Sequence, residues 1–231
     1  MRKTLLLTIA MICLVQLSNA QFIEKNKKIM GGSLGLGFSS TNDSTGATGN
    51  VLKAHNFYVS LYPSYGKAIR SNLVLGYYLS LGFNNSRNED VQNHRVNKSN
   101  SYQLGGNVFL EKFFSLSNRL AFSGRLSAGM SYSSGRSNDY LNAVLNRSNI
   151  TRNFTSGISL VPILNYKLNQ KFLLGLSAND FASVNFIKGT TESSGPNMST
   201  IKTTHTNFST GTMVNYSKGL SDVSFFFRYI F

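Results

Sequence analysis

The sequence is short of the residues on which most metal and redox sites depend. Cys13 is its only cysteine in 231 residues, and it lies in an N-terminal segment that we expect to be removed. The remaining chain then has no cysteine, which excludes a disulfide and a thiolate metal site. We predict no bound metal and no cofactor, because the sequence also lacks a glycine-rich phosphate loop and a regular series of calcium ligands.

Acidic residues are scarce as well. Nine Asp and Glu stand against 23 Lys and Arg, a net charge of +14 that falls to +12 when Arg2 and Lys3 leave with the N-terminal segment. A nucleic-acid-binding protein gathers such charge on one face, whereas these residues are scattered, so we expect no nucleic acid partner. Two interpretations stay open: contact with anionic lipid phosphates, or loops kept in solution by their charge.

Long hydrophobic runs are missing too. The apolar segment Leu5–Val15 is too short to cross a bilayer as a helix, and no later stretch is apolar enough. It follows the positive Met1–Lys3 and precedes Ser18–Ala20, whose small residues suit cleavage before Gln21. We predict a signal peptide over residues 1–20; an uncleaved anchor is the alternative that the short segment disfavours.

The end of the chain, by contrast, is strongly patterned. From Val223 to Phe231 every odd position is aromatic or β-branched. Because alternate residues of a strand face opposite sides, one face of this strand is a continuous apolar ladder. Such a ladder would be a sticky edge in a soluble protein, but the lipid-facing wall of a closed barrel requires it. The feature predicts an outer-membrane β-barrel.

The same alternation recurs along the chain. In residues 73–83 every odd position is Leu, Tyr or Phe. We expect strands at 29–39, 54–65, 73–83, 101–113, 120–133, 152–166, from 171 to a loss of phase near Asp180, and 223–231. Aromatic residues near the strand ends suggest interfacial girdles of Tyr and Phe, since tryptophan is absent. These are Phe38, Tyr65, Phe83, Phe113, Tyr132, Tyr166, Tyr229 and Phe231.

The connections alternate in length, as is typical of bacterial outer-membrane barrels. The long polar ones are 40–53, 84–100, 134–151 and 187–220, and the short ones are 66–71, 114–119 and 167–170. Thr203–Tyr216 is assigned to the last outer loop, because a ninth strand would break the parity. The prediction for residues 21–231 is one all-β domain. It is a closed antiparallel eight-stranded transmembrane β-barrel with long extracellular loops and short periplasmic turns.

These features together resemble the small outer-membrane β-barrel proteins of Gram-negative bacteria. The end of the signal segment, Ser18–Gln21, and the Asn- and Ser-rich loops resemble the versions found in Bacteroidota. The resemblance implies insertion by the barrel-assembly machinery, which reads the last strand. Phe225, Phe227, Tyr229 and Phe231 hold the matching positions. Members of this group serve as anchors, adhesins, small pores or parts of secretion systems, so the resemblance selects no single role.

Catalytic signals are weak. An outer-membrane lipid-modifying enzyme or protease would need a histidine close to a serine or an acid. Neither His55 nor His205 belongs to the His-x-Ser motif of the deacylase type. His94 lies near Glu89 and Asp90, a possible base with its orienting acid, but in a polar loop. We predict no enzymatic activity and interpret all three histidines as solvated loop residues.

The interior of the predicted barrel is the remaining place for function. One plausible pairing of neighbouring strands sets Asn107 opposite Arg125. An eight-stranded barrel is just wide enough for side chains to fill it, and buried arginine must be paired or hydrogen-bonded. We therefore interpret the inward residues as a polar plug; the alternative is a narrow conduit that prefers anions. These residues are Tyr58, Tyr62, Tyr78, Gln103, Asn107, Glu111, Arg125 and Arg228.

The sequence as a whole predicts a non-enzymatic integral protein of the cell outer membrane. We expect it to be surrounded by outer-membrane lipid and lipopolysaccharide, and to act through its extracellular loops on an unidentified ligand or surface partner. A small porin-like channel for ions or solutes is the alternative, and an outer-membrane enzyme is less favoured.

Overall fold

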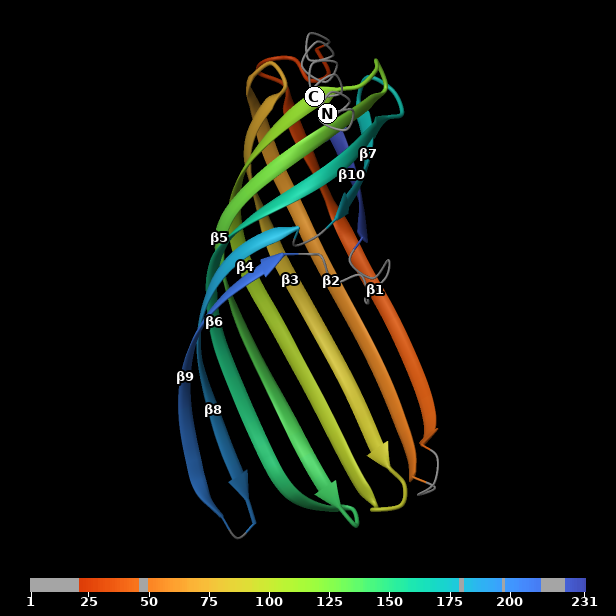
Figure 1. Ribbon diagram of the computed structural model, residues 1–231, viewed down its shortest axis with the longest axis vertical. Helices are drawn as coiled ribbons and strands as arrows, with labels where there is room; N and C mark the ends of the chain where they lie inside the picture. The colour runs from red at the N-terminus through yellow and green to blue at the C-terminus, as the bar shows by residue number, and fades with distance from the viewer. Residues whose placement is uncertain (1–20, 46–49, 179–180, 197, 213–222) are drawn as a thin grey trace, which may run out of the picture.

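Ten antiparallel strands make up most of the computed structural model (Figure 1), which describes residues 21–231 except 46–49, 179–180, 197 and 213–222. Within these residues no helix has the length and apolar character needed to cross a membrane. The strands are β1 Lys28–Thr45, β2 Asn50–Arg70, β3 Leu73–Asp90, β4 Arg95–Ser115, β5 Leu120–Leu141, β6 Val144–Lys167, β7 Phe172–Ala178, β8 Ala182–Gly195, β9 Met198–Thr212 and β10 Val223–Ile230.

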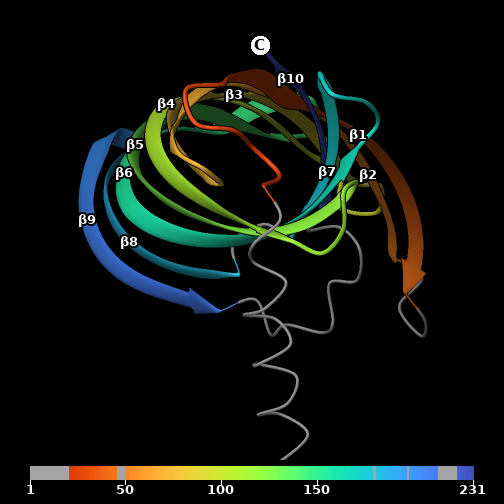
Figure 2. The ribbon, with the colours of Figure 1, turned by 90° about the horizontal axis from the view of Figure 1, so that it is seen from above.

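The strands close into a ring, seen end-on in Figure 2. Strands β1 to β6 pair in sequence order, and β7 and β10 complete the circle from β6 back to β1. All pairs are antiparallel. The predicted all-β, closed antiparallel barrel is confirmed.

Ten strands follow only eight paths around the barrel. Strand β6 pairs with β7 over Ile163–Lys167 and with β8 over Ser148–Leu160, so β7 and β8 succeed one another on one path. Strands β10 and β9 lie beyond them in the same way. The assignment of Thr203–Tyr216 to a loop is therefore wrong as far as Thr212, and the rest lies outside the described residues. Thr and Asn on both faces of this strand hide its alternation.

The predicted long outer loops are also wrong over most of their length. Strand β3 runs on to Asp90 and β4 begins at Arg95, while only Asn142 and Ala143 join β5 to β6. Asn142 and Ala143 have φ of 50° and 65°, both positive as in a type I′ hairpin. In these segments backbone pairing extends the barrel walls, but the strands have no apolar face. The hydropathy pattern therefore does not reveal them as strands. The segments concerned are 40–53, 84–100, 134–151 and 187–220.

The alternation places apolar side chains on the outer face of the barrel and a mixture of small, polar and apolar residues on the inner face. On β1, the outward Leu34 and Phe38 are 61% and 80% exposed, whereas glycine and serine alternate with them on the inner face. Among the described residues, buried inward apolar side chains pack together at the end where β10 finishes. We call this end the closed end and the opposite end the open end (Figure 1). This core contains Ile29, Ala68, Val74, Phe109, Phe113, Ala121, Leu173 and Ile230.

The ring is sealed along a short seam near the closed end. Strand β1 pairs with β10 from Ile29 to Gly32, opposite Ile230 to Phe227. Beyond Gly32 the described part of β1 pairs with β2 alone, and Figure 2 shows β1 and β9 diverging. The seam is close-packed, because a Cβ on Gly31 would overlap the backbone of Phe227 and Arg228.

Candidate functional site

A buried ion cluster spans the lumen just inside the closed end. Glu111 on β4 is 1% exposed and accepts hydrogen bonds from two arginines. The Nε and Nη2 atoms of Arg125 donate to Oε2 at 3.0 and 2.9 Å. The Nη1 and Nη2 atoms of Arg228 donate to Oε1 and Oε2 at 2.9 and 3.0 Å. We call Glu111, Arg125 and Arg228 the floor cluster.

Neutral side chains complete the floor cluster. Ser123 donates to Glu111 Oε1 at 2.7 Å, and the Asn165 amide donates to Ser123 at 2.8 Å. Ser123 and Asn165 are fully buried and Arg228 is 3% exposed. Buried charges persist only when they are paired and their remaining hydrogen-bonding groups are satisfied. The network meets this condition, and it ties four strands together across the barrel.

The strand register places these residues. Glu111 on β4 is directly opposite Arg125 on β5, and Asn107 is opposite Gly129. The expected pairing of Asn107 with Arg125 is therefore wrong by four residues. An even slip leaves every side chain on its predicted face, so alternation along a strand fixes the face and leaves the register open.

A second set of contacts fills the mouth at the closed end. Phe22 and Ile23 are 3% and 1% exposed, and their backbone N–H groups both donate to Asn72 Oδ1 at 2.8 Å. The Phe22 and Phe113 rings stack with centroids 5.9 Å apart. Lys167 Nζ donates to the Phe22 carbonyl at 2.8 Å and lies over its ring. Residues 21–27 thus turn into the barrel mouth, and we call them the N-terminal plug.

Sequence reasoning missed this plug. Its signal is small: Phe22 and Ile23 are an apolar pair in an otherwise polar segment before β1. Asn72, in the short turn after β2, has a φ of 61°, a left-handed conformation that asparagine tolerates better than most residues. Nothing in the spacing of Phe22, Asn72 and Lys167 along the chain predicts that they meet.

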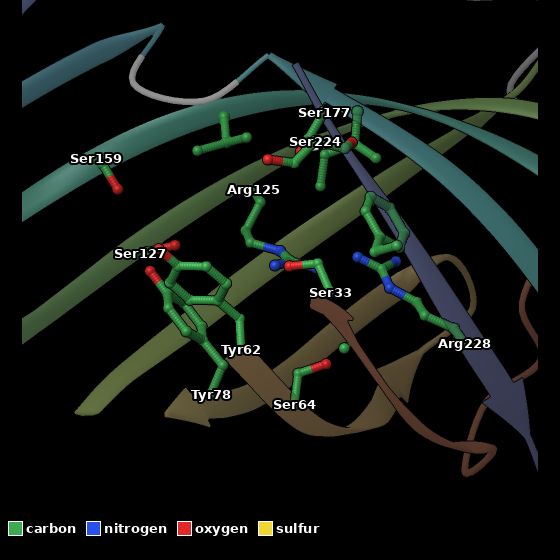
Figure 3. A pocket seen from close by; sticks show the side chains of 14 residues that line it. Ser33, Tyr62, Ser64, Tyr78, Arg125, Ser127, Ser159, Ser177, Ser224 and Arg228 are labelled. Carbon is green, nitrogen blue, oxygen red and sulfur yellow. Dashed lines mark hydrogen bonds between the residues drawn. The ribbon is translucent and has the colours of Figure 1, made fainter. Parts of the chain in front are cut away.

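Above the floor cluster the lumen is hollow. A cavity of about 330 Å³ lies on the open-end side of the floor cluster and is lined by Arg125, Arg228, Tyr62 and Tyr78 (Figure 3). It shares Tyr62, Tyr78 and Ser159 with a second cavity, which shares Tyr62 and Gln103 with a third. Together they lead from the floor cluster towards the open end.

The eight lumen residues of the sequence prediction therefore separate into three levels. Glu111, Arg125 and Arg228 form the floor cluster, and Tyr62 and Tyr78 line the cavity next to it. Asn107 lines the second cavity, Gln103 lines the second and the third, and Tyr58 lines only the third. The structure thus brings the charged members together and spreads the others along the lumen.

The aromatic ladder of β10 faces outward. Phe225, Phe227 and Phe231 are 74%, 46% and 47% exposed. Phe172 on β7 packs beside Phe227 and Tyr229, with centroids 5.2 and 5.1 Å away. Phe113, by contrast, was expected in an interfacial girdle and is buried in the closed end, because it lies on the inward face of β4.

The histidines lie on separate elements. His55 on β2 shares a 3.1 Å hydrogen bond with Ser40, and His205 on β9 is opposite Gly189. His94 ends the tight turn after β3, where the Asp90 carboxylate accepts hydrogen bonds from Asn93. Among the described residues, no three His, Cys, Asp or Glu side chains are grouped to hold a metal ion.

An ion pair fastens the tip at the open end. Arg95 at the start of β4 donates to both oxygens of Asp139 on β5, at 2.6 to 3.1 Å. Asp139 is 4% exposed. The hydrogen bonds and charge of Arg95 hold the pKa of Asp139 below its usual value, and Asp139 in turn raises the pKa of Arg95.

Comparisons with known proteins give little beyond this geometry. No family model and no curated protein matches the sequence. Among solved structures, the chain is similar to the outer membrane protein OprG from Pseudomonas aeruginosa, with 14% identity over 92% of this chain and 99% of that one, and a TM-score of 0.49. A likeness of this size carries no functional argument.

Proposed function

We propose that the protein is a non-enzymatic barrel of the outer membrane that presents its open end to the exterior and does not conduct. The first support is an aromatic girdle. Each of the eight paths carries one outward aromatic residue at a similar level, as expected where barrel walls leave the lipid. These residues are Phe38, Phe57, Phe83, Tyr102, Tyr132, Phe154, Phe186 and Phe208.

The spacing to a second aromatic level fits a bilayer. Outward aromatics recur towards the closed end, ten residues away on β5, from Tyr132 to Phe122, and twelve on β6, from Phe154 to Tyr166. A tilted strand needs about 9–11 residues to cross the hydrocarbon core. Strands β5 and β6 have 22 and 24 residues, and residues 133–141 and 144–153, about two fifths of each strand, extend past the first girdle towards the open end.

The observation that carries the proposal is the closed end. The floor cluster, the apolar core and the N-terminal plug together fill the closed end, with Glu111, Phe113 and Phe22 each at most 3% exposed. An ion would have to pass through this packed region. The hollow part of the lumen therefore communicates with the open end, which supports a surface-contact role over a channel.

Basic residues just beyond the girdle support contact with anionic lipid. Five of them face outward on neighbouring strands, two or four residues past the aromatic residue of their own strand. Arg87 and Lys98 are directly opposite each other, where like charges destabilise a sheet. Glu89 pairs with Arg87 and Glu192 with Arg152, so the five basic residues outnumber these two carboxylates. Phosphates of lipopolysaccharide would supply the further anions. The basic belt consists of Arg87, Lys98, Arg136, Arg152 and Lys188.

The same proposal gives the β10 ladder its role. Phe225, Phe227, Tyr229 and Phe231 form an accessible outward row at the last strand, where the barrel-assembly machinery would engage the chain before the β1–β10 seam closes. A Tyr229→Ser, Phe231→Ser variant is expected to assemble poorly in cells while refolding into detergent. Normal assembly of this variant in cells would contradict the proposed role of the ladder.

Ionic conductance in a planar lipid bilayer tests the central claim. The refolded chain should insert, as shown by a heat-sensitive shift in electrophoretic mobility, and give no discrete current steps. Its insertion should also leave the buried Phe22 and Ile23 protected from protease added at the closed end. Reproducible steps from wild-type protein would overturn the proposal and favour the porin-like alternative.

A further inference from the structure

The cavity above the floor cluster has the composition of a binding site for a polar solute. Eight hydroxyl groups line it (Figure 3), and its volume of about 330 Å³ exceeds that of a few waters. The shared lining residues described above give it a route to the open end. These hydroxyls belong to Ser33, Ser64, Ser127, Ser159, Ser177, Ser224, Tyr62 and Tyr78.

The charge around the cavity is positive by one unit. Two guanidinium groups share the single carboxylate of Glu111, and that carboxylate lies beneath the cavity and does not line it. The side chain of Arg125 keeps 16% exposure, against 4% for Arg228. Arg125 is therefore the cation that a solute in the cavity would meet, and a monoanion would balance the surplus charge.

One buried hydroxyl in the cavity has no hydrogen-bond partner within the described part of the chain. Ser127 is 2% exposed, and its Oγ makes no hydrogen bond with the described residues. It lies two residues from Arg125 on the same inward face of β5. Buried hydroxyl groups are nearly always satisfied, so Ser127 Oγ marks the place of a hydrogen-bonding atom that the chain itself does not supply.

The aromatic walls narrow the ligand class. Phe226 lines the cavity, and Arg228 stacks on its ring with the guanidinium carbon 4.2 Å from the centroid. Tyr62 and Tyr78 add rings with polar tips. A ligand that suits these walls has apolar C–H faces as well as hydroxyls.

We propose that this cavity binds a small hydroxylated monoanion of about the size of a hexuronic acid, with Arg125 contacting its carboxylate and Ser127 a neighbouring oxygen. The inference goes beyond surface contact, and it does not depend on the basic belt. It requires only that the lumen is reached from the open end.

Calorimetric titration of the refolded full-length chain in detergent tests the proposal. D-glucuronate should bind saturably, and D-glucose, which lacks the charge, should bind at least tenfold more weakly. Ser127→Ala should weaken glucuronate binding about five- to tenfold, because one hydrogen bond to a charged or polar ligand is lost. Ser80→Ala is the matched control, since Ser80 is also buried but lines only the second cavity.

Arg125→Gln should abolish the preference for glucuronate over glucose, provided its far-UV circular dichroism shows a folded barrel. If that variant fails to fold, Ser127→Ala decides alone. Absence of saturable glucuronate binding, equal affinity for glucose, or an unchanged Ser127→Ala titration would each overturn the proposal and leave ordered water as the partner of Ser127. Failure of this proposal would not bear on the conductance test, so the proposal of a non-conducting barrel would still be decided by that test alone.

Discussion

At the scale of single residues, Glu111 has the most exacting position. It pairs with Arg125 and Arg228 at once in a buried network. Glu111→Gln keeps the shape but leaves two guanidinium groups unbalanced, so we expect the free energy of unfolding to fall by about 3–5 kcal/mol. Urea unfolding in detergent micelles measures this change.

Glu192→Gln is the control for this experiment. Glu192 pairs with Arg152 and Lys202, and its side chain is 26% exposed. Exposed ion pairs contribute about 0–1 kcal/mol, so this variant should unfold close to wild type. Equal losses of unfolding free energy in the two variants would show that the floor cluster stabilises the barrel no more than a surface ion pair does.

Asp139 gives the open end its pH dependence. Because Arg95 lowers the pKa of Asp139 in the folded state, the ion pair stabilises the tip above the unfolded pKa of about 3.9. This stabilisation is lost as the pH falls through the lower, folded pKa. Amide exchange at the β4–β5 tip should therefore accelerate below about pH 4 relative to the barrel centre. Asp139→Asn should exchange fast at neutral pH and lose this dependence.

At the scale of strands, two glycines on opposite faces test the barrel seam. A Cβ on Gly31 would overlap Phe227 and Arg228, whereas one on Gly124 would meet nothing within 4 Å. We expect Gly31→Ala to destabilise the barrel by about 1–3 kcal/mol through overpacking. Gly124→Ala should be neutral. Heat-sensitive electrophoretic mobility and urea unfolding report both, and a neutral Gly31→Ala would mean that the seam can yield.

The same strands show what alternation predicts and what it does not. Residues 73–83 have apolar side chains on the outer face and the lumen on the other, so their apolar period predicts a strand and the face of each residue. Residues 84–90 continue the same strand with polar side chains on both faces, and there composition cannot distinguish strand from loop. The Glu111–Arg125 pairing was missed for another reason, because an even slip of the register leaves the faces unchanged.

At the scale of the whole molecule, the contacts of the closed end have a different origin from the inward or outward direction of the strand residues. The closed end combines residues from Phe22 to Ile230, more than 200 positions apart in sequence. Such contacts follow from ring closure, and no local pattern predicts them. The inward or outward direction of Tyr62, Arg125 and Arg228, in contrast, follows from the strand period alone. The face of each strand residue was therefore predictable, and the N-terminal plug was not.

The basic belt makes a prediction about the molecule in its membrane. If Arg87, Lys98 and Arg136 contact lipid phosphates, lipopolysaccharide should stabilise the wild-type barrel in phosphatidylcholine vesicles. Replacing all three with Gln should remove about 1 kcal/mol of that gain per charge. The change should shrink in high salt, which screens exposed charges.

A matched triple variant separates the belt from net charge. Lys25→Gln, Lys27→Gln and Lys171→Gln remove the same charge at the closed end, outside the girdle. Their gain from lipopolysaccharide should equal that of wild type, because no outer-leaflet phosphate reaches this end. If both triple variants lose the gain equally, the effect belongs to overall charge. The position of the basic belt next to the aromatic girdle would then have no effect of its own on stabilisation by lipopolysaccharide. The proposal that the open end faces the exterior would lose its support from lipid contact.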